Sequence, residues 1–152
     1  MTTTNQHPGE DLPDLERRIP SEYRPLAQEG FLGYLGGIWV RQADGCVDTC
    51  LLIAADHLNP NGTVHGGVLL SLLDYTLGAT AEAALGQGTG RHPATISLTT
   101  HFLAAADRRD LLFGTAQVLR RTRTLSFVEG QVSSGGRPVA SASAVFRNPA
   151  LA

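Results

Sequence analysis

The sequence lacks several features that would assign it to a particular class of protein. None of its 12 basic residues is lysine, which we interpret as compositional bias, and its net charge of −2 does not indicate a nucleic-acid-binding surface. The sequence contains no run of about 18 apolar residues, so it does not predict a transmembrane helix. The N-terminus has neither the basic start nor the apolar core of a signal peptide. We therefore expect a cytoplasmic protein that binds neither nucleic acid nor a membrane.

The cysteines and histidines do not predict a metal site or a disulfide. Cys46 and Cys50 lie in a segment with strand character, where their separation would be roughly 13 Å. That distance is too long for a disulfide. No Cys-x-x-Cys motif is present, and the five histidines do not have the spacing of zinc ligands. We expect reduced structural thiols and no metal.

Proline is concentrated near the start of the chain. Four of the eight prolines occur in the first 29 residues, among many charged side chains. This composition predicts an N-terminal tail over residues 1–29, with a short helix or turn around residues 14–24. The chain as a whole is 42% hydrophobic and 17% charged, which is enough apolar content for one core. We predict a single domain over residues 30–152, without an internal repeat.

Segments with strand character, separated by turn signals, predict six strands. The first two, residues 31–42 and 46–55, are joined by Ala43-Asp44-Gly45, a good hairpin signal. The last predicted strand alternates clearly between two faces. The other strands are expected at residues 94–104, 111–121, 124–134 and 138–147.

Residues 66–85 predict the one long helix of the chain. This segment is apolar on nearly every face, so we expect it to be buried. The glycine-rich residues 86–90 stop it. Two strands, a helix and four further strands predict an α+β fold, in which a mostly antiparallel sheet curls around the single buried helix.

The start of this helix combines two groups with complementary chemistry. A loop from Asn59 leads into Gly66 and Gly67, where the free N–H groups of a helix N-terminus can hold a carbonyl oxygen or an oxyanion. Asp74 follows in the same apolar helix, where a charge is costly. Its neighbours one turn away are apolar or small, which indicates a cleft or an interface. The combination points to acyl chemistry.

These residues also carry a family resemblance. The pattern Asn59-x-x-Gly62-x-x-His65-Gly66-Gly67-x6-Asp74, with Thr95 in the next strand and Arg-Thr-Arg at 121–123, resembles the hotdog-fold acyl-CoA thioesterases of the phenylacetate-degradation (PaaI-like) group. It covers about residues 30–147. Thr122 differs, because relatives often have glycine between the two arginines. The resemblance implies a hotdog fold, hydrolysis of an acyl-CoA substrate without a cofactor, and a homodimer or homotetramer.

The resemblance also implies roles for individual residues. Asp74 would be the nucleophile or the general base, and the backbone N–H of Gly66 would bind the thioester carbonyl oxygen. Asn59 would position the attacking water or the carbonyl, or would only form an Asx turn before Pro60. Thr95 would support the acid or the water.

Further residues are expected around the substrate. His65 would act in catalysis or serve as a helix cap, and Gly67 would contact the substrate or allow close packing of the backbone. Arg121 and Arg123 would bind the phosphates of coenzyme A, or would lie on a solvated strand edge. The acyl pocket would be lined by apolar side chains such as Leu73, Leu77 and Phe102.

The spacing within the helix has a consequence of its own. Gly66 and Asp74 are eight residues apart, which corresponds to roughly 12 Å along a helix. One acyl carbon cannot contact both groups at that distance. We therefore expect the active site to lie at a dimer interface, with Gly66 from one subunit and Asp74 from the other.

Two other functions fit the same residues. A hotdog hydratase or dehydratase would pair His65 with a carboxylate and act on an enoyl thioester without releasing thiol. A non-catalytic protein would bind acyl-CoA or a small aromatic acid. The residues leave three points open, namely the acyl group, nucleophilic or base catalysis by Asp74, and assembly beyond the dimer.

Overall fold

The fold is one curled antiparallel sheet around one long helix. The computed structural model describes residues 16–26, 29–86, 92–108 and 110–150. Within them the helices are α2 (Gly30–Leu35), a 3₁₀ turn η1 (Ala55–His57) and the long α3 (Gly66–Leu85). The strands are β1 (Arg24–Pro25), β2 (Ile38–Ala43), β3 (Cys46–Leu52), β4 (Ala94–Phe102), β5 (Leu111–Arg121), β6 (Leu125–Ser134) and β7 (Arg137–Arg147).

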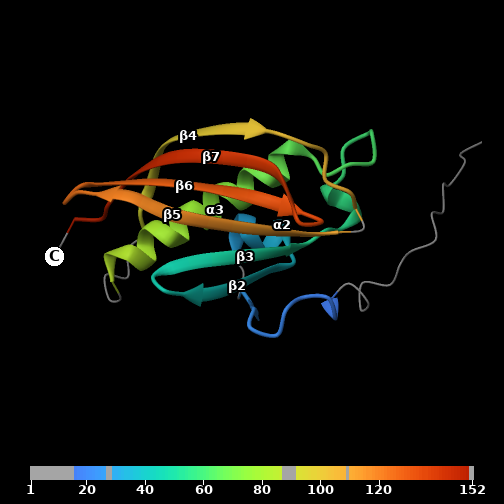
Figure 1. Ribbon diagram of the computed structural model, residues 1–152, viewed down its shortest axis with the longest axis horizontal. Coiled ribbons are helices and arrows are strands. Elements are labelled where there is room, and N and C mark those ends of the chain that lie inside the picture. The colour runs from blue at the N-terminus through green and yellow to red at the C-terminus, as the bar shows by residue number, and fades with distance from the viewer. Residues whose placement is uncertain (1–15, 27–28, 87–91, 109, 151–152) are drawn as a thin grey trace, which may run out of the picture.

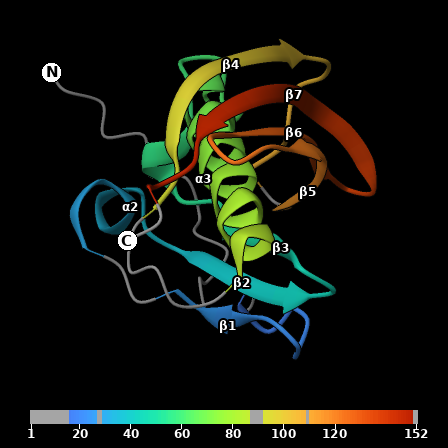
Figure 2. The same ribbon diagram turned by 90° about the vertical axis from the view of Figure 1, so that its left-hand side faces the viewer.

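The seven strands form a single sheet in the order β1-β2-β3-β5-β6-β7-β4. Every neighbouring pair is antiparallel. The chain passes from β3 through α3 to β4 at the far edge of the sheet, and then returns to β5 beside β3. Figures 1 and 2 show the sheet bending around α3, with β4 and β2 on opposite sides of the helix. This arrangement confirms the predicted α+β hotdog fold.

The helix α3 supplies the centre of the core. Its Leu72, Leu73 and Leu77 side chains have no exposed surface, and burying a leucine contributes about 2 kcal/mol. Polar side chains on the buried face are hydrogen-bonded: the Thr76 hydroxyl bonds the Leu72 carbonyl and the Thr49 hydroxyl, both at 2.7 Å. The sheet therefore holds α3 as a rigid rod.

The length and composition of α3 would also permit a membrane span, with a mean hydropathy of 1.3. The lack of an 18-residue apolar run in the sequence therefore does not by itself exclude a membrane span. The sheet covers the face of α3 that carries Leu72, Leu73 and Leu77, which makes that face a core element. The predicted burial of the helix is confirmed for this face, since 44% of the apolar window is buried. No other described segment has these properties.

The predicted helix 66–85 and the last four strands are confirmed within a few residues. The predicted strand 46–55 ends earlier, at Leu52. The hairpin is also confirmed, since Asp44 and Gly45 adopt positive φ values of 51° and 77°. Cys46 and Cys50 are free thiols in β3, and burial raises the pKa of the Cys50 thiol to about 12.

The predicted strand 31–42 is wrong in its first half. Residues Gly30–Leu35 form the short helix α2, and only Ile38–Ala43 form a strand. Gly36 and Gly37 separate the two elements with positive φ values of 69° and 63°, a conformation that an extended strand does not contain. The sheet also begins before residue 30, because Arg24 and Pro25 pair with Val40 and Trp39.

Candidate active site

The first turn of α3 has one amide N–H that is capped and one that is open. His65 is the N-cap, and its Nδ1 accepts a hydrogen bond of 2.9 Å from the Gly67 N–H. A Cβ at Gly67 would lie 3.0 Å from that Nδ1, so glycine there leaves room for the ring. Among the described residues, no acceptor contacts the Gly66 N–H. Gly66 is therefore the available donor of this helix start.

The loop before α3 is fixed by its own hydrogen bonds. The Asn59 Oδ1 accepts from the backbone N–H of Asn61 and Thr63, at 2.9 and 3.3 Å, and its Nδ2 donates to the Thr63 hydroxyl at 2.9 Å. Asn59 thus forms the Asx turn that the sequence allowed. The side chain of Asn59 shapes the loop that aims the start of α3.

A buried histidine ties this loop to the rest of the fold. The His57 Nδ1 accepts from the Ala54 N–H at 3.0 Å, which assigns the proton to Nε2, and Nε2 donates to the Leu35 carbonyl at 2.6 Å. The His57 carbonyl in turn accepts from the His65 N–H at 2.8 Å. The position of His65 is therefore set from both sides, by its ring and by its backbone.

The structure brings Asp74 and Thr95 together. The Thr95 hydroxyl, on β4, donates to Asp74 Oδ1 at 2.8 Å. Asp74 is half-buried on α3, and no other donor to its carboxylate is found among the described residues. Asp74 therefore has one oxygen held by a neutral hydroxyl and a second oxygen available to a ligand.

Phe102 lies over Gly66, at the N-terminal end of α3. A Cβ at Gly66 would lie 3.3 Å from Phe102 Cε1, so the ring covers the Gly66 end of α3. Phe102 is nevertheless 57% exposed. It therefore has an exposed apolar surface next to Gly66.

Leu73 and Leu77, which were also expected to line that pocket, lie in the core instead. Both have no exposed surface, and Leu77 packs against Gly130 of β6. They face the sheet, so a ligand on the open side of this chain would not reach them.

The two arginines of the Arg-Thr-Arg motif have different surroundings. An Nη1 hydrogen of Arg121 is donated to the Ala84 carbonyl in the last turn of α3, where a cation is favourable. Arg123 instead lines a cleft near the start of β6, together with Arg147. Arg147 belongs to no local motif, and only the pairing of β7 with β6 and β4 brings it there.

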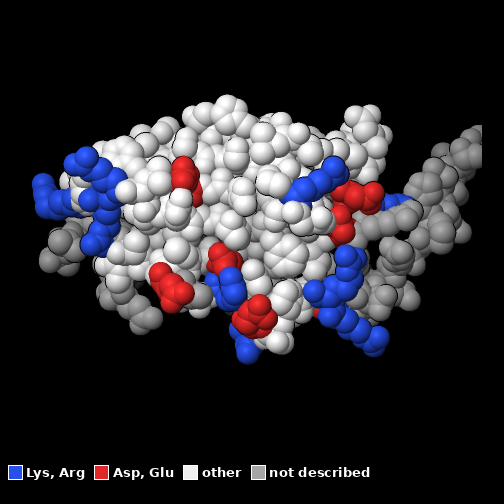
Figure 3. Space-filling view, viewed as in Figure 1, with Lys and Arg blue, Asp and Glu red and all other residues white. Residues whose placement is uncertain are grey.

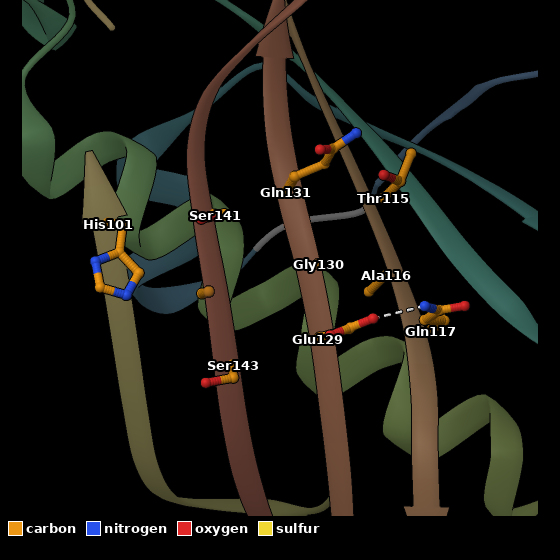
Figure 4. Close-up of a pocket in the computed structure, with 10 residues that line it drawn as sticks. His101, Thr115, Ala116, Gln117, Glu129, Gly130, Gln131, Ser141 and Ser143 are labelled. Atoms are coloured by element: carbon orange, nitrogen blue, oxygen red, sulfur yellow. Dashed lines mark hydrogen bonds between the residues drawn. The ribbon is translucent and has the colours of Figure 1, made fainter. Parts of the chain in front are cut away.

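A depression in the described part of the chain lies away from Asp74. It is a groove of about 600 Å³ on the outer face of the sheet, away from α3. Figure 4 shows its side chains standing on β4 to β7, with Gln117 turned toward Glu129 and His101 apart from them. Gln117 Nε2 donates to Glu129 Oε1 at 2.7 Å. This groove has a polar lining without an oriented nucleophile, so we do not assign the chemistry to it.

Comparison with known proteins gives consistent relatives. A family model, Thioesterase superfamily, matches residues 61–141. A Pseudomonas aeruginosa protein that carries the name putative esterase is 32% identical over 133 residues, or 86% of this chain and 98% of that protein. The match confirms the resemblance seen in the motif around Gly66 and Asp74.

Solved structures show the same fold. A Ralstonia eutropha protein, named a putative thioesterase and phenylacetic acid degradation-related protein, is 31% identical with a TM-score of 0.70, covering 82% of this chain and 92% of that one. A Streptococcus pneumoniae structure named a hypothetical thioesterase with coenzyme A is 22% identical with a TM-score of 0.66, covering 76% and 92%. The second likeness concerns the fold alone.

The cap formed by His65 makes a prediction for stability. Replacing His65 with alanine removes the acceptor for the Gly67 N–H, so the free energy of unfolding should fall by about 1 kcal/mol. His65→Asn restores a side-chain acceptor at the N-cap and should recover most of that loss. Urea unfolding of the three proteins measures the difference, and equal stability of His65→Ala and wild type would rule out the cap.

Proposed function

This chain belongs to the thioesterase superfamily, and we propose that it hydrolyses an acyl-coenzyme A to a free acid and coenzyme A. Its family and its relatives make it a thioester hydrolase. The carrier is part of the proposal; a Streptococcus pneumoniae protein with the same fold was solved with coenzyme A. We place this reaction in the cytoplasm, where the sequence led us to expect the protein.

The pairing of Asp74 with Thr95 carries the proposal. The Asp74 carboxylate on α3 is held at one oxygen by a neutral hydroxyl, at 2.8 Å. That arrangement orients the carboxylate. The second oxygen of Asp74 is left to contact a water molecule or the acyl carbon.

A thioester needs little else. Sulfur delocalises poorly into the carbonyl and a thiolate leaves readily, so an oxyanion donor and a base or nucleophile suffice, without a metal or another cofactor. In the base reaction, Asp74 takes a proton from water, the hydroxyl oxygen bonds to the acyl carbon, and the C–S bond breaks. The thiolate of coenzyme A then accepts the proton. The open Gly66 N–H stabilises the negative carbonyl oxygen between these steps.

In the alternative reaction, the Asp74 carboxylate attacks the acyl carbon and releases the thiolate. Water then attacks the Asp74 carbonyl carbon of the resulting mixed anhydride, which regenerates the carboxylate with a solvent oxygen and releases the acid with an Asp74 oxygen. A single turnover in heavy-oxygen water separates the two routes. Base catalysis puts solvent oxygen into the acid at once, whereas a nucleophilic Asp74 donates its own oxygen first.

The active site requires two copies of the chain. Gly66 and Asp74 are separated by roughly 12 Å of rigid helix, and β4 is the free edge of the sheet, since it pairs only with β7. Apolar residues lie along or next to this edge with large exposed fractions: Ile96 58%, Phe102 57% and Leu103 57%. An unpaired, apolar edge strand favours pairing with a second strand.

A twofold pairing of β4 strands has the geometry that the chemistry needs. Within one chain, the Thr95 end of β4 contacts Asp74 and the Phe102 end covers Gly66. Antiparallel pairing of two β4 strands places the Phe102 end of one beside the Thr95 end of the other. Each Gly66 N–H is then carried toward Asp74 of the partner subunit. Sedimentation velocity distinguishes this dimer from the tetramer that the resemblance also allows.

The hydratase alternative loses support from the helix cap. A histidine base needs a ring nitrogen with a free lone pair, whereas the His65 Nδ1 accepts the Gly67 N–H and thereby leaves Nε2 as an N–H donor. Thiol release from saturated acyl-CoAs separates the two activities, because a hydratase releases none.

The role of Asp74 predicts a large loss of turnover. Asp74→Asn and Asp74→Ala should each lower kcat for thiol release by at least about 100-fold, because neither side chain can act as base or nucleophile. A panel of aromatic, short-chain and medium-chain acyl-CoAs with a thiol reagent measures this and identifies the acyl group. Glu129→Gln is the matched control, since that carboxylate also accepts one hydrogen bond from a neutral side chain but lies on the outer face. Unchanged thiol release in both Asp74 variants would refute the proposal.

The hydrogen bond from Thr95 predicts a smaller effect. Thr95→Val keeps the shape but removes the hydroxyl, so kcat should fall about tenfold with KM unchanged, because orientation of Asp74 is lost and substrate contacts are kept. Thr95→Ser retains the donor and should restore kcat. If the serine and valine variants behave alike, the hydroxyl does not position Asp74.

A further inference from the structure

We propose that the Thr100 hydroxyl, on the face of β4 that is turned toward α3, recognises an acyl group that carries a hydroxyl or keto oxygen within a few carbons of the thioester. This inference rests on the proposed function, because it concerns the acyl group of the same substrate. Thr100 belongs neither to the motif around Gly66 and Asp74 nor to the apolar residues expected in the pocket.

Strand pairing shows which face of β4 carries Thr100. Residues directly opposite each other in an antiparallel pair point to the same side of the sheet. Thr100 is opposite Ala142 of β7, and the residues two positions before and after Thr100 are also opposite alanines of the core. Thr100 therefore faces α3. Its neighbour His101 instead lines the groove on the outer face of the sheet (Figure 4).

A β-bulge allows one strand to turn both Thr95 and Thr100 toward α3. The two threonines are five positions apart, so a regular strand would point them to opposite faces. The register shifts between Thr95 and Ser97, and the extra residue brings Thr95 to the inward face, where it bonds Asp74. Thr100 thus lies on the inward face of β4 between the Thr95 contact with Asp74 and the ring of Phe102.

The Thr100 hydroxyl has no hydrogen-bond partner. Its Oγ1 is the one buried side-chain nitrogen or oxygen atom without a partner in the described ranges. By contrast, the buried hydroxyls of Thr49 and Thr76 bond each other at 2.7 Å. A buried hydroxyl without a partner lowers stability, and valine has the same branched shape on a strand without that penalty. A threonine is therefore useful at this position when its hydroxyl bonds a ligand.

Phe102 connects this hydroxyl to the reacting end of α3. Its ring lies against Gly66, since a Cβ there would be 3.3 Å from Cε1. A carbonyl oxygen that reaches the Gly66 N–H meets this ring, which is 57% exposed and is not part of the core cluster. Displacing such a side chain uncovers the inward face of β4 beside it, where Thr100 is the next residue along.

The spacing on β4 determines where the acyl oxygen lies. Successive inward-facing residues of a strand are about 7 Å apart, and a hydrogen bond between two hydroxyls spans about 2.8 Å of that distance. The remaining length of about 4 Å corresponds to a few carbon–carbon bonds. An oxygen on the third or fourth carbon of the acyl group can therefore bond Thr100 while the carbonyl oxygen is at Gly66.

The surroundings of Thr100 suit a neutral oxygen rather than a charged group. The sequence of β4 contains no Asp, Glu, Lys or Arg, and Figure 3 shows uncharged surface along the upper margin, where β4 lies in Figure 1. No cation on this strand would compensate a carboxylate. A threonine hydroxyl both donates and accepts, so Thr100 can bond either a hydroxyl or a keto oxygen.

Binding of matched acyl-CoAs tests this role without turnover. Asp74→Asn is the background, because it keeps the thioesters intact. Isothermal titration compares butanoyl-CoA with 3-hydroxybutanoyl-CoA, 4-hydroxybutanoyl-CoA and 3-oxobutanoyl-CoA. We expect at least one oxygen-bearing group to bind about tenfold more tightly than butanoyl-CoA, which is the contribution of one hydrogen bond. Adding Thr100→Val should remove this preference, and adding Thr100→Ser should keep it.

Thr99→Val is the matched control. Thr99 is the neighbouring threonine of β4, but it is opposite Ser143 and is exposed on the outer face. This variant should keep the preference. The urea midpoint gives a second readout, whose sign a purely structural role of Thr100 would reverse. Because Thr100→Val removes a hydroxyl without a partner, its midpoint should rise.

Several outcomes would overturn the assignment. These are equal binding of all four acyl-CoAs in the Asp74→Asn background, a preference that survives Thr100→Val, the same loss in Thr99→Val, or a lower urea midpoint for Thr100→Val. The failure of the proposed function is distinct. A wild-type protein that releases thiol from no acyl-CoA, while the preference in binding depends on Thr100, refutes the hydrolysis and leaves this site in place. Active hydrolysis with binding that is independent of Thr100 does the reverse.

Discussion

The enclosure of α3 by the sheet is the constraint on which the rest of the structure depends. Because Leu72, Leu73 and Leu77 are fully buried, the helix cannot shift or bend to bring Gly66 and Asp74 together. Its rise therefore sets the distance between the Gly66 N–H and the Asp74 carboxylate. A rigid helix fixes the position of each group but keeps the two groups apart. The proposed chemistry therefore needs α3 of a second subunit beside the first.

Neighbouring residues at the start of α3 have different hydrogen-bonding roles. The His65 ring takes up the Gly67 N–H, the His57 carbonyl holds the His65 backbone, and the Asn59 turn fixes the approach of the loop. Among the first N–H groups of α3, only that of Gly66 has no acceptor within the described residues. A helix start usually has several open donors. Here the cap and the loop leave one open donor, the Gly66 N–H, which points in a defined direction, as an oxyanion site requires.

Local patterns were sufficient for the main elements and insufficient for the contacts between them. The helix 66–85 could be predicted because its apolar run is long and is bounded by glycines, and the four later strands because turn signals separate them. Residues 31–42 were misread because an apolar, aromatic segment suits a strand as well as a short helix, and only the backbone at Gly36 and Gly37 decides. Leu73 and Leu77 were placed in the pocket because a helix that is apolar all round does not reveal which face meets the sheet.

Contacts between distant segments were harder still. The Arg121 contact with Ala84 spans 37 residues. The turn around Arg123 is joined to the end of β7 by Asn148 and by the pairing of Leu125 with Arg147. Spacing within a motif cannot predict such contacts, because they depend on how strands pair across the sheet. The proximity of Asp74 and Thr95 was expected only from the family resemblance, and the hydrogen bond between them is what the structure adds.

The central claim is that each active site takes Gly66 from one subunit and Asp74 from the other, and subunit complementation tests it most directly. Gly66→Pro removes the N–H, and proline suits the first helical position after the extended His65, whose φ and ψ are −64° and 136°. Asp74→Asn removes the carboxylate, so each variant alone should be inactive. Mixed dimers formed by refolding the two variants together contain one intact site, and an equal mixture should regain about a quarter of wild-type thiol release. If no activity returns although the mixed dimers form, each site lies within a single chain and the account is wrong.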